Sequence, residues 1–273
     1  MTRTDAEIAR LALETMDLTD LSDDATLEGA LALAQRAAEH GTAAVCVWPR
    51  FVAASAQALD GTGVRVATVV NFPGGADAAD DVAALTRQAV ADGADEIDVV
   101  LPYRAFLAGD VAGAAAVLDA TREAAGDSDV KVIIESGELR ETDAIEAAAG
   151  LAVEHGAQFV KTSTGKSPVS ATPEAARAIL GVLADLSDGV EPVGFKASGG
   201  IRTVADARVY LELADEIMGA DWVSPSTFRF GASGLLDDVL RVLGAESESG
   251  DGGESGPGSG PGSDADAPAG SSY

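Results

Sequence analysis

The stretch FVKTSTGKSPVSATPEAARAILGVLADLSDGVEPVGFKAS, residues 159–198, holds two short apolar segments with a longer segment between them. FVKTS (159–163) and VGFKAS (193–198) are rich in β-forming residues, whereas TPEAARAILGVLADL (172–186) repeats its apolar residues with the period of a helix. Strands that alternate with helices in this way indicate a parallel sheet. The stretch therefore predicts one unit of a parallel α/β fold.

The same alternation extends over most of the chain, where segments such as DDVAALTRQAVA (80–91) have the length and spacing of crossover helices. Eight candidate strands favour closure into a (β/α)8 TIM barrel, which commonly takes about 250 residues as one domain. We expect this α/β barrel to occupy residues 1–244. The six further strands are predicted at ETMDL (14–18), AAVCVW (43–48), VRVATVVNF (64–72), EIDVVL (96–101), VKVIIES (130–136) and TFRFGAS (227–233).

Residues 245–273 differ in composition from the rest of the chain. They consist largely of Gly, Ser, Pro and acidic residues, with Tyr273 as the single aromatic residue. Such a segment cannot bury enough apolar surface to offset the conformational entropy lost on ordering. We expect a flexible acidic tail.

The formal charge of −27 makes nucleic acid and anionic membrane surfaces unfavourable partners. The N-terminal segment lacks the apolar core of a signal peptide, and no run approaches the roughly 18 apolar residues of a membrane span. We therefore expect a soluble cytoplasmic protein. The acidic residues spread along the chain are also typical of a halophilic surface.

Cys46 is the single cysteine, and the only histidines are His40 and His155. A disulfide framework or a His/Cys metal site cannot be assembled within one chain from so few of these residues. We expect no metal and no other cofactor, which disfavours metal-dependent aldol chemistry.

Lysine is rare in this chain, and arginine supplies most of the basic residues. Three of the four lysines fall in KTSTGK (161–166) and FKASGG (195–200), and the fourth is Lys131. Because lysine is otherwise almost absent, its presence in two short Gly-containing segments indicates that a side-chain amine has a function in these segments.

Asp98, Lys161 and Lys196 each interrupt an otherwise apolar strand. A charge that points into a barrel is costly unless it is paired or functional, and active sites of such barrels lie at the C-terminal ends of the strands. A buried salt bridge between Asp98 and one lysine is the structural alternative, but it leaves the second lysine unexplained.

The three residues form a coherent catalytic set. A lysine attacks a carbonyl only when it is neutral, and lowering its pKa by about 3 requires about 4 kcal/mol, which burial and a second ammonium can supply. We therefore predict a Schiff-base aldolase with Lys161 as the nucleophile, Lys196 as the neighbouring cation and Asp98 as the proton-transfer carboxylate.

Glycine-containing segments follow three of the late strands, at Gly165–Lys166, Gly199–Gly200 and Gly231–Gly234. Each alone is typical of a turn, but exposed backbone N–H groups bind anions, and barrels often hold phosphate after strands 7 and 8. Together the three segments favour a small phosphorylated substrate.

The chain resembles the deoxyribose-phosphate aldolase family over nearly all of residues 14–240. The resemblance is carried by EIDVVLPYRAFLAGD, VIIESGEL, FVKTSTGKSPVSATPEAAR, VGFKASGGIRTVADA and FRFGASGLL, with MDLTDLSDD and VCVWPRFV also similar. It implies a metal-independent class I aldolase of deoxyribose-phosphate catabolism that reversibly cleaves 2-deoxy-D-ribose 5-phosphate into acetaldehyde and D-glyceraldehyde 3-phosphate.

The resemblance also implies roles for individual residues. Lys161 corresponds to the Schiff-base lysine, Lys196 to the lysine that tunes it, and Asp98 to the acid/base carboxylate. The terminal Tyr273 resembles a tail tyrosine that assists proton transfer in some members. Further positions are implied to surround the substrate phosphate, namely Gly165, Lys166, Gly199, Gly200, Ser233 and Gly234, or to line the pocket, namely Asp17 and Thr19.

Two segments depart from the family pattern. GASG stands where many members have two consecutive serines, so Gly234 lacks a hydroxyl whose hydrogen bond would be worth about 1 kcal/mol. KASGG stands where some members have a proline after the lysine, and the backbone donors are retained in both segments.

Two other functions are alternatives: a non-catalytic sugar-phosphate sensor and a different Schiff-base phosphosugar aldolase. A sensor would be indicated by the absence of a catalytic residue from the sequence. A homo-oligomer is expected, although no segment identifies its interface.

Overall fold

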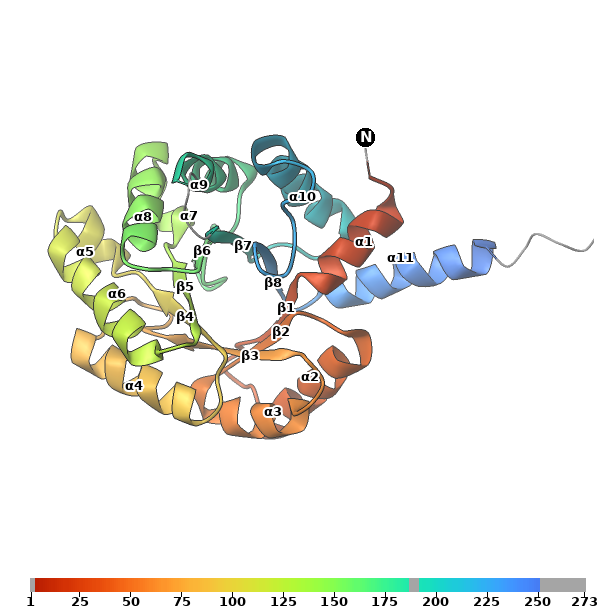
Figure 1. Cartoon of the computed structure of the whole chain (residues 1–273), viewed down its shortest axis with the longest axis horizontal. Coiled ribbons are helices and arrows are strands. Elements are labelled where there is room, and N and C mark those ends of the chain that lie inside the picture. The colour runs from red at the N-terminus through yellow and green to blue at the C-terminus, as the bar shows by residue number, and fades with distance from the viewer. Residues whose placement is uncertain (1–2, 187–191, 251–273) are drawn as a thin grey trace, which may run out of the picture.

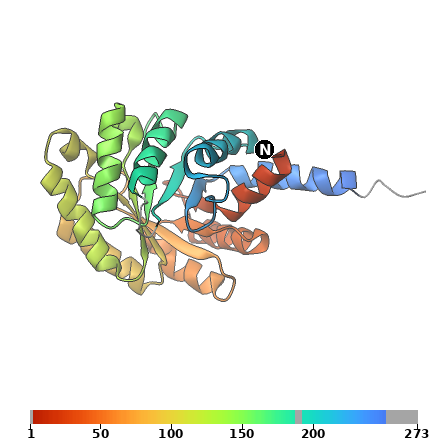
Figure 2. The same ribbon diagram turned by 45° about the horizontal axis from the view of Figure 1, so that its top comes forward.

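The computed structural model describes residues 3–186 and 192–250, with side chains described as far as residue 245. Eight parallel strands close into a barrel in the order β1 to β8, with β8 pairing back onto β1, and helices surround it (Figures 1 and 2). The predicted (β/α)8 barrel is confirmed. The strands are β1 Met16–Asp20, β2 Ala44–Val47, β3 Arg65–Val70, β4 Glu96–Val100, β5 Asp129–Ile133, β6 Phe159–Lys161, β7 Gly194–Ser198 and β8 Phe228–Ala232.

The helices cover the outer face of the barrel, and several begin at residues that cap their free N–H groups. Thr4 and Thr203 form capping boxes with Glu7 and Asp206 at the starts of α1 and α10. The helices are α1 Asp5–Glu14, α2 Leu27–His40, η1 Pro49–Phe51, α3 Val52–Leu59, α4 Ala79–Ala91, α5 Tyr103–Leu107, α6 Val111–Ala125, α7 Ser136–Leu139, α8 Thr142–Glu154, α9 Pro173–Leu186, α10 Val204–Met218 and α11 Leu235–Gly250.

The first and last helices lie side by side, and α11 extends outward beyond the barrel wall (Figure 1). The predicted boundary between residues 244 and 245 falls inside α11, which continues to Gly250. The remainder of the predicted tail, residues 251–273, lies outside the described residues. No helix in the described part of the chain has the length and apolar character needed to span a membrane.

The main hydrophobic core lies between the strands and the helices, where Leu18, Ile97 and Val132 are fully or almost fully buried. Because side chains alternate along a strand, the residues next to these face the barrel interior. A smaller apolar cluster of Leu21, Cys46, Ala67 and Val69 also forms part of the core. The barrel additionally buries charged side chains, which is unusual because such interiors are dominated by branched apolar residues.

Candidate active site

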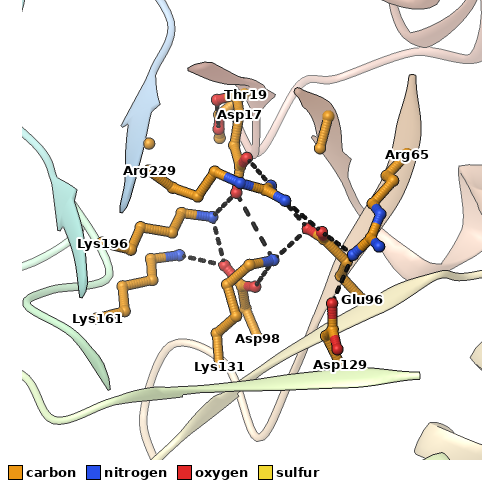
Figure 3. Close-up of polar contacts among 12 residues, drawn as sticks. Asp17, Thr19, Arg65, Glu96, Asp98, Asp129, Lys131, Lys161, Lys196 and Arg229 are labelled. Carbon is orange, nitrogen blue, oxygen red and sulfur yellow. Dashed lines mark hydrogen bonds and ion pairs between the residues drawn. The ribbon is translucent and has the colours of Figure 1, made fainter. Parts of the chain in front are cut away.

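The register of the late strands aligns three basic residues. Lys161 of β6 is the lateral partner of Lys196 in β7, and Lys196 is the partner of Arg229 in β8. On the strands that precede β6 in the barrel, Asp98 of β4 is the partner of Lys131 in β5. Because lateral partners project from the same face of a sheet, these side chains converge inside the barrel (Figure 3).

Asp98 lies at the centre of the group and contacts three lysines. Its Oδ2 atom accepts hydrogen bonds from Lys161 Nζ at 2.8 Å and from Lys196 Nζ at 2.7 Å. Its Oδ1 atom accepts one from Lys131 Nζ at 3.0 Å. An ion pair between Asp98 and a single lysine therefore does not describe the site, because both candidate catalytic lysines contact the same oxygen atom of Asp98.

Asp17 and Glu96 pair with the other cations. Asp17 accepts from Lys196 Nζ at 2.5 Å and from Arg229 Nη1 at 2.6 Å. Glu96 accepts from Arg229 Nη2 at 2.8 Å and also contacts Lys131. Arg65 joins Glu96 to Asp129 at the edge of the cluster, as Figure 3 shows. The network is therefore continuous from Lys161 to the N-terminal ends of the strands.

This buried cluster holds one more cation than carboxylates. Of the described residues, three carboxylates and four cations take part inside the barrel: Asp17, Glu96, Asp98, Lys131, Lys161, Lys196 and Arg229. An uncompensated buried charge is costly. One cation can therefore lose its proton and leave each carboxylate compensated.

The directions of the pKa shifts favour Lys161 as this cation. Burial lowers the pKa of Lys161, Asp98 opposes the change, and the adjacent ammonium of Lys196 lowers it further. For Lys196, burial alone would lower the pKa, but Asp17 and Asp98 together raise it above its ordinary value. Lys161 is therefore favoured as the neutral amine, and Lys196 remains an ammonium.

The pKa of Asp98 is also lowered, but by its charged neighbours and against the effect of burial. Burial would raise its pKa, but Lys131, Lys161 and Lys196 hold the pKa of Asp98 well below its usual range. The carboxylate is therefore ionised at neutral pH. It can accept a hydrogen bond from each lysine, but it is a weak proton acceptor while all three are charged.

A cavity of about 360 Å³ lies at the C-terminal end of the barrel. Ser198 and Gly231 form its wall close to Lys196, and Thr164 lies just beyond Lys161 in the chain. Lys161 itself is only 2% exposed. Asp98, Lys161 and Lys196 are not among the lining residues of the cavity, whose wall is formed in part by the glycine loops.

Most of the residues proposed to bind the substrate line this cavity, namely Thr19, Gly165, Lys166, Gly199, Gly200 and Ser233. Three of the glycines adopt left-handed φ values, with Gly165 at 77°, Gly199 at 86° and Gly200 at 85°. Glycine adopts this conformation without the strain of other residues. The glycines are therefore suited to turn backbone N–H groups toward an anion.

The other predicted residues lie elsewhere. Asp17 is fully buried within the charged cluster, and Gly234 lies just before α11 rather than among the lining residues. Lys166 lines the rim, with its Nζ 3.1 Å from Asp23 Oδ1. Tyr273 lies outside the described residues.

Glu96, Lys131 and Arg229 were not predicted to belong to the site. Each had the signal that identified Asp98, Lys161 and Lys196, because each is a charged residue in an apolar strand segment: EIDVV, VKVII or FRFGA. Applied to every strand, that criterion would have found the whole cluster. No group of three or more His, Cys, Asp or Glu residues in the described ranges is placed to hold a metal ion.

Comparisons with known proteins agree with this geometry. The family model described as DeoC/LacD family aldolase matches residues 11–238. A deoxyribose-phosphate aldolase from Agrobacterium fabrum is 51% identical over 242 residues, which cover 87% of this chain and 92% of the relative.

Solved structures are also similar. One from Coccidioides immitis, assigned as a deoxyribose-phosphate aldolase, has a TM-score of 0.77 and 32% identity, covering 89% of this chain and 88% of the other. One from Toxoplasma gondii with the same assignment has a TM-score of 0.82 and 26% identity, covering 90% and 97%.

Proposed function

The chain belongs to the DeoC/LacD family of aldolases, and from this premise we propose that it cleaves 2-deoxy-D-ribose 5-phosphate through an imine on Lys161. The products are acetaldehyde and D-glyceraldehyde 3-phosphate, and the reaction is reversible. The observation that carries the mechanism is the contact of Lys161 and Lys196 with one oxygen atom of Asp98. This arrangement combines an amine of lowered pKa, a persistent ammonium and a carboxylate.

The reaction begins with addition of neutral Lys161 Nζ to the aldehyde carbon C1 of the open-chain sugar. The carbinolamine loses water and becomes a protonated imine, which withdraws electrons from the adjacent bonds. Lys196, which is held as an ammonium, can donate the proton that the departing hydroxyl needs.

Cleavage follows at the C2–C3 bond. A base removes the proton of the C3 hydroxyl, the electron pair of the C2–C3 bond moves toward the imine, and glyceraldehyde 3-phosphate leaves. The remaining enamine takes a proton at C2, and water then hydrolyses the imine to acetaldehyde and free Lys161. The reaction requires neither an oxidant nor a reductant.

Asp98 is proposed to transfer protons in this cycle, acting on the C3 hydroxyl through water. Its pKa is held low by the surrounding lysines, so it does not retain a proton for long. It contacts both Lys161 and Lys196, and a proton taken at one group can therefore pass to the other. In this role the carboxylate is a relay between two amines.

The phosphate is proposed to lie at the rim of the cavity, bound by Lys166 and the backbone N–H groups of Gly165, Gly199 and Gly200. Ser233 and Gly234 precede α11, and the start of a helix favours an anion. Binding of the phosphate would fix the reacting carbons near Lys161. Lys166 would exchange its exposed partner Asp23 for the phosphate.

Several further properties are part of the proposal. The −27 charge supports an acidic, halophilic surface, and the few His and Cys residues support chemistry without a metal. The proposal also includes a cytoplasmic location and a homo-oligomeric assembly. A sensor without turnover is not favoured, because Lys161, Lys196 and Asp98 are all present and in contact.

The decisive experiment incubates the protein with acetaldehyde and borohydride and maps the modified peptide. Reduction should leave an ethyl adduct on Lys161, and the protein should cleave 2-deoxy-D-ribose 5-phosphate. An adduct on another lysine would refute the mechanism. An adduct on Lys161 without cleavage of this sugar would favour another phosphosugar aldolase.

A further inference from the structure

Glu135 follows the C-terminal end of β5 and has an unusual conformation. Its side chain is almost fully buried, and its backbone is left-handed, with φ 55° and ψ 57°. A residue with a Cβ is strained in this region and keeps the conformation only where its surroundings impose it. The proposed reaction gives Glu135 no role.

The Glu135 carboxylate binds the loop that follows β6. Its Oε2 atom accepts a hydrogen bond from Thr164 Oγ1 at 2.5 Å, and its Oε1 atom accepts one from Ser167 Oγ at 2.9 Å. The backbone N–H of Thr164 lies 3.3 and 3.4 Å from the two carboxylate oxygens. Both ends of the segment Thr164–Ser167 are therefore held by one side chain.

The Thr164 hydroxyl extends this arrangement to the lysine. It donates to Glu135 and accepts a hydrogen bond from the backbone N–H of Lys166 at 3.0 Å. The backbone of the segment that carries Gly165 and Lys166 is thus fixed on the side away from the substrate cavity. Thr164 and Lys166 line that cavity and also a smaller one of about 230 Å³, and of these two cavities Glu135 lines only the smaller.

The segment also packs against the next glycine loop. A Cβ atom on Gly199 would lie 3.3 Å from the Cα atom of Gly165. A shift of Gly165 would therefore change the space available to Gly199. The two loops proposed to hold the phosphate depend on one another, and Glu135 anchors the first of them.

From these contacts we infer that Glu135 is a positioning residue that fixes the phosphate-binding segment Thr164–Ser167 and so determines the preference for a phosphorylated sugar. The inference rests on the proposed function. Glu135 does not line the substrate cavity and so acts from behind the loop, where its carboxylate does not face the phosphate dianion. Its effect should therefore appear in reactions of phosphorylated substrates and not in imine formation with small aldehydes.

The test compares Glu135→Gln with wild type and with Glu138→Gln. Glutamine replaces one of the two carboxylate oxygens with an N–H donor and removes the negative charge, so Thr164 Oγ1 and Ser167 Oγ can no longer both donate to it. Ser167 Oγ also lies 3.0 Å from the carbonyl oxygen of Val169. Glu138 lies in the same short helix α7 and is half-buried, and within the described ranges its carboxylate forms no hydrogen bond. It controls for the loss of one acidic group at this end of the barrel.

A second variant, Thr164→Val, removes the hydroxyl that links Glu135 to Lys166 while nearly preserving the shape of the residue. Two rates are measured for each protein: kcat/KM for 2-deoxy-D-ribose 5-phosphate, and the rate of borohydride trapping with acetaldehyde. In Glu135→Gln and Thr164→Val we expect kcat/KM to fall about tenfold or more, as for a lost hydrogen bond to a charged group. Trapping should stay at the wild-type rate.

An equal fall in both rates would mean that Glu135 only supports the fold, and an unchanged kcat/KM would mean that it does not position the loop. Either result would overturn the inference. A wild-type protein that neither traps acetaldehyde nor cleaves the sugar phosphate would instead refute the proposed function.

Discussion

Lys161 and Lys196 are lateral partners on β6 and β7, and both donate to the Oδ2 atom of Asp98. Their environments nevertheless differ, because Lys196 has Asp17 as a second carboxylate whereas Lys161 has Asp98 alone. This difference is the reason that the pKa of Lys161 is lowered while that of Lys196 is raised. Two identical side chains are thus favoured in different protonation states, Lys161 as the neutral amine and Lys196 as the ammonium.

Replacing Lys196 with Leu should raise the pKa of Lys161, because the ammonium that lowers it is removed. Each rise of 1 in that pKa reduces the neutral amine about tenfold at neutral pH. Activity should therefore fall more at pH 7 than at pH 10, as measured by kcat/KM profiles. Equal loss across the profile would indicate a direct proton-transfer role for Lys196.

Asp98→Asn should have the opposite effect on the amine. Asp98 raises the pKa of Lys161, so its removal should lower that pKa and move acetaldehyde trapping to lower pH. Turnover should still fall by about 10² to 10⁴, the range for loss of a positioned proton-transfer group. Trapping that moves to higher pH would contradict the charge arrangement, and circular dichroism should verify the fold.

Gly231→Ala should impair catalysis by displacing Lys196. A Cβ atom at Gly231 would lie 2.5 Å from Ser198 Oγ and 3.0 Å from Lys196 Cε. Since Lys196 is packed among other charged groups, we expect kcat to fall about tenfold or more. Gly181→Ala in α9 is the matched control, because a Cβ there meets no atom within 4 Å. It should leave kcat unchanged and raise the thermal midpoint slightly.

The buried carboxylates should make stability sensitive to acid. The pKa of Asp98 is lower in the folded protein than its value of about 4 in the unfolded chain. Its contribution is therefore fully present above about pH 5 and is lost as pH falls toward the folded pKa, because only the unfolded chain binds the proton.

The quantity to measure is the difference in unfolding free energy between wild type and Asp98→Asn. The contributions of the surface carboxylates are the same in both proteins and cancel in this difference. Urea unfolding should give a constant difference between pH 5 and 7 and a smaller one near pH 3. A difference that does not change down to pH 3 would show that Asp98 has an ordinary pKa in the folded protein.

Deletion of Tyr273 tests the resemblance of the chain terminus to the tail of some family members. If the tyrosine assists proton transfer at the enamine, turnover should slow and the thermal midpoint should not change. Exchange of the methyl protons of acetaldehyde with deuterium in the solvent, followed by NMR, measures this step directly. An exchange rate equal to that of wild type would leave the residue without a catalytic role.

The fold could be predicted from the sequence because its signals are local. The alternation of β-rich and helical segments placed each of the eight strands within a few residues of its observed position. The boundary predicted at residue 244 falls within α11, which continues to Gly250 through a segment whose composition is typical of a tail.

The residues of the site were only partly predictable, because a charged residue in a strand is a local signal whereas its contacts are long-range. A charge in an apolar strand is visible in the sequence, and this identified Asp98, Lys161 and Lys196. Which of the strand charges contact one another is not visible, because Lys196 lies 179 residues from Asp17 and 98 residues from Asp98 along the chain.

What the sequence determined by itself is therefore the barrel and the presence of an amine, a second cation and a carboxylate within it. Only the tertiary structure decided that one oxygen of Asp98 serves both lysines, that Arg229 and Glu96 complete the charge balance, and that Glu135 holds the loop of Lys166. Strand periodicity is a property of neighbouring residues, whereas lateral register is set when the eighth strand closes onto the first.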